Sequence, residues 1–257
     1  MRVVKIGGRA QNDPALAAKI REAWDDSRNS LCVVHGGGDE ISTLQRLMGR
    51  ESLFVGGRRV TSREDIEVLR MVLSGTVNKR LVSAFNAAGA PAVGLSGEDG
   101  SLIEAEIIDA DSLGYAGRPR KINDRLLRSI MSAGYMPVIS PVAAGTAPTP
   151  VAAGALNVNG DDAAAAIASA LGADELLLIA DVDGVRDGEG QTIASLSMDQ
   201  AQELVANGVA GGGMAAKLEA ASKALLAGVE RVRVCDLHGL SDGERGTFIT
   251  QSQGVVT

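Results

Sequence analysis

Short runs of apolar residues alternate along the chain with longer stretches in which apolar residues recur every three or four positions. The short runs are typical of buried strands, and the longer stretches are typical of amphipathic helices. We expect strands at residues 3–6, 31–35, 93–95, 136–140, 175–180, 231–235 and 246–250, and a strand or hairpin at 101–109. We expect helices at 14–26, 39–48, 62–88, 121–133, 161–171, 197–207 and 215–226, and a loop at 143–155. This alternation predicts an α/β protein with a largely parallel, doubly wound sheet.

The composition supports this fold class and removes several classes of partner. The 257 residues can form one large domain or two closely packed lobes. Only 2% are aromatic, so Ala, Val, Ile and Leu must fill the core, and single-stranded nucleic acid has no stacking platform. The net charge of −7 argues against a phosphate-backbone partner. We expect a cytoplasmic protein, because we find neither a membrane-spanning apolar run nor a secretory pattern.

The cysteine content adds little chemistry. Cys32 and Cys235 each stand beside a valine-rich run. This setting favours buried, reduced thiols over a disulfide or a metal pair.

Three clusters of glycine stand next to predicted strands and helices. They are Lys5-Ile6-Gly7-Gly8, His35-Gly36-Gly37-Gly38 and Gly211-Gly212-Gly213, the last followed by Met214 and Lys217. Glycine lets the backbone turn sharply and bring N–H groups close to an anion, and a helix that starts there adds its positive end. We expect His35 itself to bond the backbone. The dinucleotide-binding and P-loop spacings are both absent, so a nucleotide would be held in another way.

Two polar segments complete the candidate chemistry. Asn157 and Asn159 stand on alternate positions before Asp161, where they can offer amide donors to a ligand, and Asp161 can serve as an N-cap or first-turn acid. Arg58 and Arg59 precede a potential helix cap. An arginine can grip a carboxylate with two parallel hydrogen bonds, and we select Arg59 for this role and expect Arg58 to be solvated.

The ordered set of motifs resembles the acetylglutamate kinases, a branch of the amino acid kinase family. The motifs are Val-Lys5-x-Gly-Gly8, His35-Gly-Gly-Gly38, Gly57-x-Arg59-Val-Thr61, Val-Asn78-Lys79, Gly94-Leu-Ser-Gly97-x-Asp99-Gly100, Asn157-Val-Asn159-x-Asp161, Asp181-Val-x-Gly184-Val185 and Gly213-Met214-x-x-Lys217. They cover nearly the whole chain. The resemblance implies a three-layer α/β sandwich with a mostly parallel central sheet, an acyl-amino-acid-binding lobe at residues 1–172 that also dimerises, and a nucleotide-binding lobe at 173–257.

The resemblance also implies a reaction and a role for each motif. The reaction is phosphorylation of the γ-carboxylate of N-acetylglutamate by ATP with Mg²⁺, a step of arginine synthesis. The implied catalytic residues are Lys5, Lys217 and Asp161, with no protein metal ligand. The implied substrate-binding residues are Gly37, Gly38, Arg59 and Asn157. The implied phosphate- and nucleotide-binding residues are Gly7, Gly8, Asp181, Gly184, Gly212, Gly213 and Met214.

Two alternatives stay open. A related kinase of lysine or arginine synthesis acts on α-aminoadipate or glutamate held by an amino-group carrier protein, and Arg58, Arg59 and Arg63 are compatible with a basic mouth for such a carrier. A non-catalytic sensing subunit on the same fold is the other, although Lys5, Asp161 and Lys217 are all present. The first strand is not preceded by the helix that links dimers into hexamers in arginine-inhibited relatives, so we expect a homodimer that is insensitive to arginine.

Overall fold

The computed structural model describes residues 1–28, 30–146 and 154–251. Its strands are β1 (Arg2–Ile6), β2 (Leu31–His35), β3 (Phe54–Val55), β4 (Arg58–Arg59), β5 (Ala92–Gly97), β6 (Ile103–Ile107), β7 (Ala116–Ile122), β8 (Met136–Gly145), β9 (Ala155–Val158), β10 (Glu175–Ile179), β11 (Ser195–Ser197), β12 (Arg231–Cys235) and β13 (Thr247–Thr250). Its α-helices are α1 (Leu16–Asp26), α2 (Gly38–Leu47), α3 (Arg63–Leu69), α4 (Asn78–Ala87), α5 (Ala110–Leu113), α6 (Asp124–Ser132), α7 (Gly160–Leu171), α8 (Met198–Ala206) and α9 (Gly212–Leu226).

One sheet runs through the described part of the chain. Ten of its eleven strands follow the order β11-β13-β12-β10-β1-β2-β8-β6-β7-β9, and the eleventh, β5, pairs with β8 beside this path. β1 lies in the middle, parallel to β10 on one side and to β2 on the other. The pairs β6–β7, β8–β9 and β12–β13 are antiparallel. The sheet is therefore mixed but mostly parallel, as expected, and β3 and β4 form a separate hairpin.

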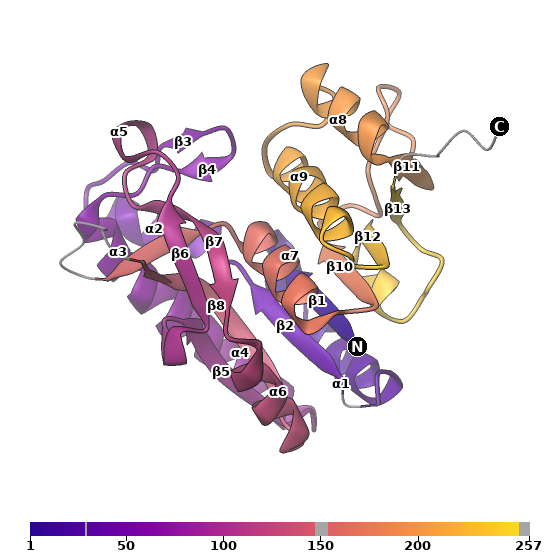
Figure 1. Cartoon of the computed structure of the whole chain (residues 1–257), viewed down its shortest axis with the longest axis horizontal. Coiled ribbons are helices and arrows are strands. Elements are labelled where there is room, and N and C mark those ends of the chain that lie inside the picture. Colours follow the sequence, from indigo (N-terminus) through magenta and orange to yellow (C-terminus); the bar gives the residue numbers. More distant parts are fainter. Residues whose placement is uncertain (29, 147–153, 252–257) are drawn as a thin grey trace.

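Each central strand is apolar on both faces, because helices cover both. In β1, Val3 belongs to the buried cluster that includes residues of α6, α7, α8 and α9, whereas Val4 and Ile6 belong to the cluster that includes residues of α1, α2, α3 and α4. In β2, Cys32 and Val34 face the first set of helices, and Leu31 and Val33 face the second. This alternation of contacts across the pleat produces the three layers that the resemblance implied. In Figure 1, α7 and α9 lie side by side over β1, β10 and β12.

The helix expected at residues 62–88 contains a π-helical segment. α3 begins with a capping box between Ser62 and Asp65, the segment Arg70–Val77 follows, and α4 continues to Ala87. The three segments are contiguous, so the long helix is confirmed, but the π-helical segment within it was not predicted. Periodicity over a long apolar stretch does not register the extra residue that a π turn accommodates.

The loop expected at residues 143–155 was only partly correct. β8 extends to Gly145 and β9 begins at Ala155, so the two ends of that stretch belong to antiparallel strands. Residues 147–153 of the expected loop lie outside the described residues. Small residues such as Ala143 and Ala144 pack between neighbouring strands, which composition alone does not reveal.

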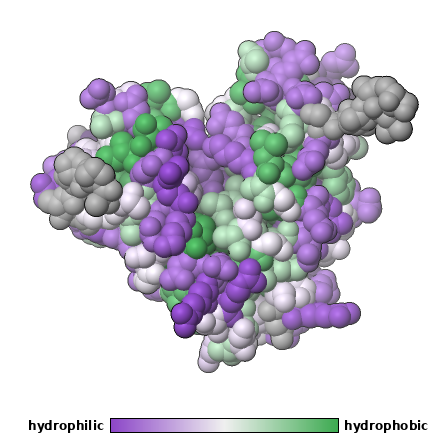
Figure 2. Space-filling model, in the orientation of Figure 1, coloured by the Kyte–Doolittle hydropathy of each residue, from purple (hydrophilic) through white to green (hydrophobic). Residues whose placement is uncertain are grey.

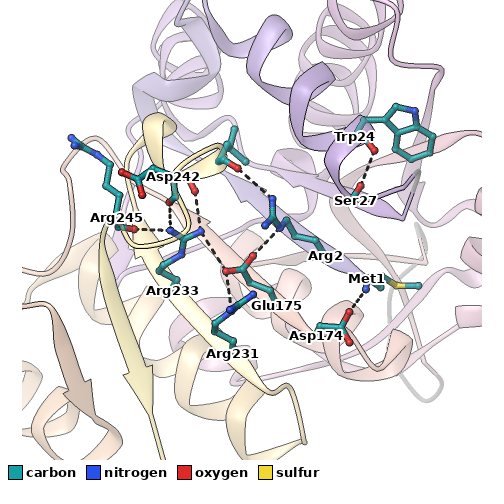
Figure 3. A network of polar contacts seen from close by, with 12 residues as sticks. Met1, Arg2, Trp24, Ser27, Asp174, Glu175, Arg231, Arg233, Asp242 and Arg245 are labelled. Carbon is teal, nitrogen blue, oxygen red and sulfur yellow. Dashed lines mark hydrogen bonds and ion pairs between the residues drawn. The ribbon is translucent and has the colours of Figure 1, made fainter.

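A buried charge cluster ties together the amino-terminal parts of three strands (Figure 3). The Glu175 carboxylate of β10 lies 2.8 Å from Arg2 of β1, 3.3 Å from Arg231 and 3.4 Å from Arg233 of β12. Arg233 is fully buried and also donates hydrogen bonds to three carbonyl oxygens of the loop before β13, those of Gly239, Asp242 and Arg245. The cluster fixes the order β1-β10-β12 at the edge opposite the glycine clusters.

Both cysteines are buried and free, as expected, and burial raises the pKa of each thiol to about 12. Among the described residues, no helix is both long and apolar enough to cross a membrane.

Candidate active site

Two lysines and one aspartate meet where β1 faces α7 and α9. Lys5 lies on the same face of β1 as Val3, so its side chain passes between those helices. The Lys5 ammonium is 3.0 Å from Oδ1 of Asp161, and the Lys217 ammonium is 3.4 Å from the same oxygen. Relative exposures of 6%, 4% and 9% show that all three side chains are almost entirely removed from solvent. The structure therefore brings together the three predicted catalytic residues.

The start of α7 explains the position of Asp161. Asn159 is the N-cap, and its side-chain oxygen accepts the backbone N–H of Asp161. Asp161 is therefore a first-turn acid and not the cap. The cap engages only the side-chain oxygen of Asn159, and this residue also lines the cavity described below, so the donation of its amide to a ligand stays a prediction. Gly160 lies against the Lys5 stem, since a Cβ there would be 3.2 Å from Lys5 Cε. An acid in the first turn is also favoured by the helix dipole.

The charges of this group are strongly coupled. Burial alone would raise the pKa of the Asp161 carboxyl, but the two ammonium groups outweigh it and hold that pKa below its ordinary value. Burial, assisted by the positive charge of Lys5, lowers the pKa of Lys217 to about 8. With both lysines protonated the group carries one net positive charge, which suits it to bind an anion.

The first two glycine clusters bring the backbone to the same edge of the sheet. Gly7 and Gly8 directly follow β1, and Gly8 has a left-handed φ of +55°. A Cβ on Gly8 would lie 2.9 Å from both carboxylate oxygens of Asp181, so these two predicted phosphate-site residues are neighbours. A Cβ on Gly37 would lie 2.6 Å from Cδ2 of Leu73, so that turn is packed closely against the π-helical segment.

A cavity opens beside the charged group and is lined by most of the predicted substrate residues. Its lining comprises Lys5, Gly36–Gly38, Ile41, Phe54, Gly57–Arg59, Leu73, Ala116, Gly117, Pro141 and Asn157–Asp161. It thus combines glycine turns, two arginines and an amide with apolar walls. Figure 2 shows the surface hollowed at the top of the view, where the parts carrying the β3–β4 hairpin and α8 separate.

The side chains of Arg59 and Asn157 are held by the protein itself. The Arg59 guanidinium donates to Gln45 Oε1 at 2.7 Å, to the Gly38 carbonyl at 2.9 Å and to Ser42 Oγ at 3.0 Å, and it lies 4.7 Å from the ring centre of Phe54. Burial lowers its pKa from the ordinary value. The Asn157 amide donates to Thr61 Oγ1 at 2.8 Å. These contacts orient both groups at the cavity wall.

The third glycine cluster lies at the amino end of α9. Gly211, Gly212 and Gly213 are exposed, Gly212 has a φ of +52°, and added Cβ atoms would meet nothing within 4 Å. Met214 is half-buried in the first turn, and Lys217 follows on the buried side. The open, positive end of a helix is suited to phosphate groups.

Other predicted residues serve the fold. A Cβ on Gly184 would meet Thr247 Oγ1 at 2.6 Å and Thr192 Cγ2 at 2.7 Å, so packing accounts for this glycine and its nucleotide role stays a prediction. His35 is buried, and its Nδ1 lies 2.8 Å from the Gly36 carbonyl, which confirms the expected backbone bond. Its other ring nitrogen meets the Asn78 amide at 3.0 Å, and burial lowers the His35 pKa to about 4.

Sequence reasoning missed the surroundings of Arg58. We had expected Arg58 to be solvated, but it lies at the cavity and pairs with Asp162 at 2.7 Å. The consecutive acids Asp161 and Asp162 could have predicted this pair. Only one of the two can face Lys5, so the other needs a different cationic partner. Thr61 was also missed as the partner of Asn157.

Comparison with known proteins identifies the family of the chain. Residues 1–236 match the model of the amino acid kinase family. The chain belongs to the amino acid kinase family. Its relatives include the acetylglutamate kinase of Paracoccus denitrificans, 46% identical over 91% of this chain and 76% of the relative. They also include the acetylglutamate kinase of Methanopyrus kandleri, 42% identical over 97% and 100% of the two chains.

Solved structures share the whole fold. A protein of Streptococcus mutans UA159 aligns with a TM-score of 0.86 and 30% identity, over 97% of this chain and 98% of its own. A carbamate kinase from Giardia lamblia shows the same fold at 14% identity and a TM-score of 0.71. Membership of this kinase family implies that the chain uses ATP.

Proposed function

We propose that this chain phosphorylates the γ-carboxylate of N-acetylglutamate with ATP, giving an acyl phosphate in arginine synthesis. The observation that carries the proposal is the buried Lys5–Asp161–Lys217 group, which lies beside a cavity with arginine and amide groups at its wall. The acetylglutamate kinases among its relatives, at 42–46% identity, support the choice of substrate.

The proposed roles follow from the chemistry of phosphoryl transfer. A carboxylate oxygen of the substrate attacks the γ-phosphorus, and the bond between that phosphorus and the bridging oxygen of ADP breaks. The transition state is loose, so catalysis is mainly positioning and charge neutralisation. Lys5 and Lys217 neutralise the transferring group from two sides, and Asp161 holds both ammonium groups in place. The attacking carboxylate is already ionised near neutral pH, so no general base is required.

The acyl amino acid would occupy the cavity. Arg59 and Asn157 would bind its α-carboxylate and acetamido group, and the N–H groups of Gly37 and Gly38 would bind the reacting end. Ile41, Phe54 and Leu73 give the cavity apolar walls that suit a small acyl group. These walls belong to the lobe formed by residues 1–172.

The nucleotide would lie along the amino end of α9, in the lobe formed by residues 173–257. Gly7, Gly8, Gly212 and Gly213 would donate N–H groups to its phosphates, and Asp181, Gly184 and Met214 would line it. Mg²⁺ would enter on the phosphate oxygens, where it commonly keeps few protein ligands. Within the described residues, no three His, Cys, Asp or Glu side chains gather as a metal site.

A substrate panel tests the proposal. The purified chain is incubated with ATP, Mg²⁺ and one acceptor, and acyl phosphate is trapped with hydroxylamine as a hydroxamate. We expect a signal with N-acetylglutamate and none with glutamate or carbamate. A signal only with a carrier-linked acceptor would overturn the proposal in favour of the carrier-dependent relative. No signal with any acceptor, in a chain that binds ATP, would favour a sensing subunit.

We also infer that the chain acts as a homodimer in the cytoplasm. Exposed apolar residues on the acyl-binding lobe, among them Met71 on the π-helical segment, are candidates for the interface. Light scattering coupled to gel filtration should give twice the 26.4 kDa of one chain. A mass of one chain across the micromolar range would contradict the dimer.

A further inference from the structure

The β3–β4 hairpin is joined to α9 by a set of ion pairs outside the group that holds the two catalytic lysines. The Arg58 guanidinium leaves β4 and lies 2.7 Å from Oδ2 of Asp162 in the first turn of α7. The other oxygen of Asp162, Oδ1, accepts from Lys223 of α9 at 2.7 Å. Glu219, one turn earlier on α9, lies 3.6 Å from Arg58. We call these four residues the hairpin–α9 network.

The ion pairs of the hairpin–α9 network are less exposed than ordinary surface ion pairs. The Asp162 side chain is 6% exposed, and each of its two oxygens has a different cationic partner. The Arg58 side chain is 19% exposed. Charges that are partly removed from water interact more strongly than exposed pairs, and a carboxylate with both oxygens engaged is tightly oriented.

A backbone contact links the same two elements. Gly57 has a left-handed φ of +75°, and a Cβ there would lie 3.2 Å from the carbonyl oxygen of Gly212. The hairpin therefore approaches the glycine turn that begins α9, the turn assigned above to the nucleotide phosphates. Phe54 and Arg59 of the same hairpin line the cavity assigned to the acyl amino acid.

We propose that the hairpin–α9 network couples the two substrate sites, so that nucleotide on α9 stabilises the hairpin over the acyl substrate and the acyl substrate strengthens nucleotide binding. Arg58 and Asp162 act as positioning residues, because Asp162 does not line the cavity and neither is needed to neutralise the phosphoryl group. This inference rests on the proposed function for the identity of the acyl ligand.

Linkage measurements test the coupling. The dissociation constant of N-acetylglutamate is measured by calorimetry with and without the non-hydrolysable nucleotide AMP-PNP and Mg²⁺. We expect the wild-type chain to bind N-acetylglutamate about ten-fold more tightly with nucleotide present. In Asp162→Asn this ratio should fall to within about two-fold of unity, whereas N-acetylglutamate alone should bind as in the wild type. By reciprocity, the acyl substrate should lose its effect on AMP-PNP binding to the same extent.

Two further variants separate coupling from general damage. Lys223→Gln changes an exposed residue that does not line the cavity, and it should lower the coupling ratio without lowering the melting temperature. Lys121→Gln is the matched control, because Lys121 is also an exposed lysine and pairs with Glu104 at 3.1 Å between the neighbouring strands β7 and β6. Lys121→Gln should keep the wild-type ratio. Wild-type coupling in both Asp162→Asn and Lys223→Gln would overturn the inference.

Hydrogen exchange tests the coupling without the acyl ligand. AMP-PNP and Mg²⁺ alone should slow amide exchange in residues 54–59 of the wild-type chain, and should leave that exchange unchanged in Asp162→Asn. Slowed exchange in a chain that does not bind N-acetylglutamate would contradict the proposed substrate and leave the coupling intact. Equal slowing in both proteins would contradict the coupling itself.

Discussion

One carboxylate oxygen organises the candidate chemistry. Lys5 and Lys217 stand at opposite ends of the chain, yet both ammonium groups lie against Oδ1 of Asp161. Motif order in the sequence was sufficient to choose these three residues. It did not predict that they share one oxygen, or that Asp162 turns away to Arg58, because those details depend on how α7 and α9 pack.

Removal of one lysine should affect the reaction far more than folding. We expect Lys217→Ala to lower kcat by about 10²–10³-fold, the usual cost of losing one charge-stabilising donor. The free energy of unfolding should fall by no more than about 1–3 kcal/mol, because Asp161 keeps its bond to Lys5. Steady-state kinetics and urea denaturation measure the two quantities. An unfolded variant would mean that Lys217 is mainly structural, and Lys19→Ala at a half-buried position of α1 is the control.

The pKa of Lys217 predicts an alkaline limit to nucleotide use. Because burial lowers this pKa to about 8, the ammonium form is complete below that pH and is lost as the pH rises through it. We expect kcat/KM for ATP to fall about ten-fold per unit above pH 8, as one required proton is lost. In Lys217→Arg any residual activity should lack this fall, since a guanidinium stays protonated. A flat wild-type profile up to pH 9.5 would contradict the assignment.

At the scale of elements, the sequence pattern located the long central strands and the helices that pack on them. β1, β2, β10 and β12 were placed within a residue, because each is a short run of mostly buried and mainly apolar residues. β3, β4, β9 and β11 have only two to four residues and were missed, since so short a pattern carries no period. The π-helical segment was missed because its side chains still form an apolar stripe.

The contact between α4 and β5 gives an element-scale prediction. A Cβ on Gly94 would lie 2.0 Å from Oδ1 of Asn78 and 2.9 Å from Val82, so Ala cannot fit without moving the helix. Gly94→Ala should lower the free energy of unfolding by about 1–3 kcal/mol, the usual cost of overpacking. Gly188→Ala is the control, because nothing lies within 4 Å of a Cβ there. Chemical denaturation of both variants measures the difference, and equal stabilities would refute the packing argument.

At the scale of the molecule, the sheet joins residues from every part of the chain. The candidate site takes side chains from β1, β4, β9, α7 and α9, and the Glu175 cluster holds the opposite edge (Figure 3). The resemblance to a known family predicted this architecture. The residues of the Glu175 cluster were not predicted, because arginines in strands look exposed when their buried partner lies in another strand.

The Glu175 cluster should be among the larger electrostatic contributions to stability. Glu175→Ala leaves the fully buried Arg233 without its carboxylate, and an uncompensated buried charge costs about 3–5 kcal/mol. Asp25→Ala breaks an exposed pair with Arg21 and should cost less than about 1 kcal/mol. Denaturant titration measures the free energy of unfolding of both variants. Glu175→Gln keeps an acceptor oxygen, so its free energy of unfolding should fall by less. This variant replaces Glu175→Ala in the measurement if the alanine variant does not fold.

The central position of β1 has a consequence for synthesis on the ribosome. β1 can pair with β2 soon after both emerge, but its partner on the other side, β10, is made only after most of the chain. Until then the strand that carries Lys5 presents an open, apolar edge to solvent. Slow translation of the stretch before residue 175 would prolong that exposure, so the yield of native protein should depend on holdase chaperones more than its final stability suggests.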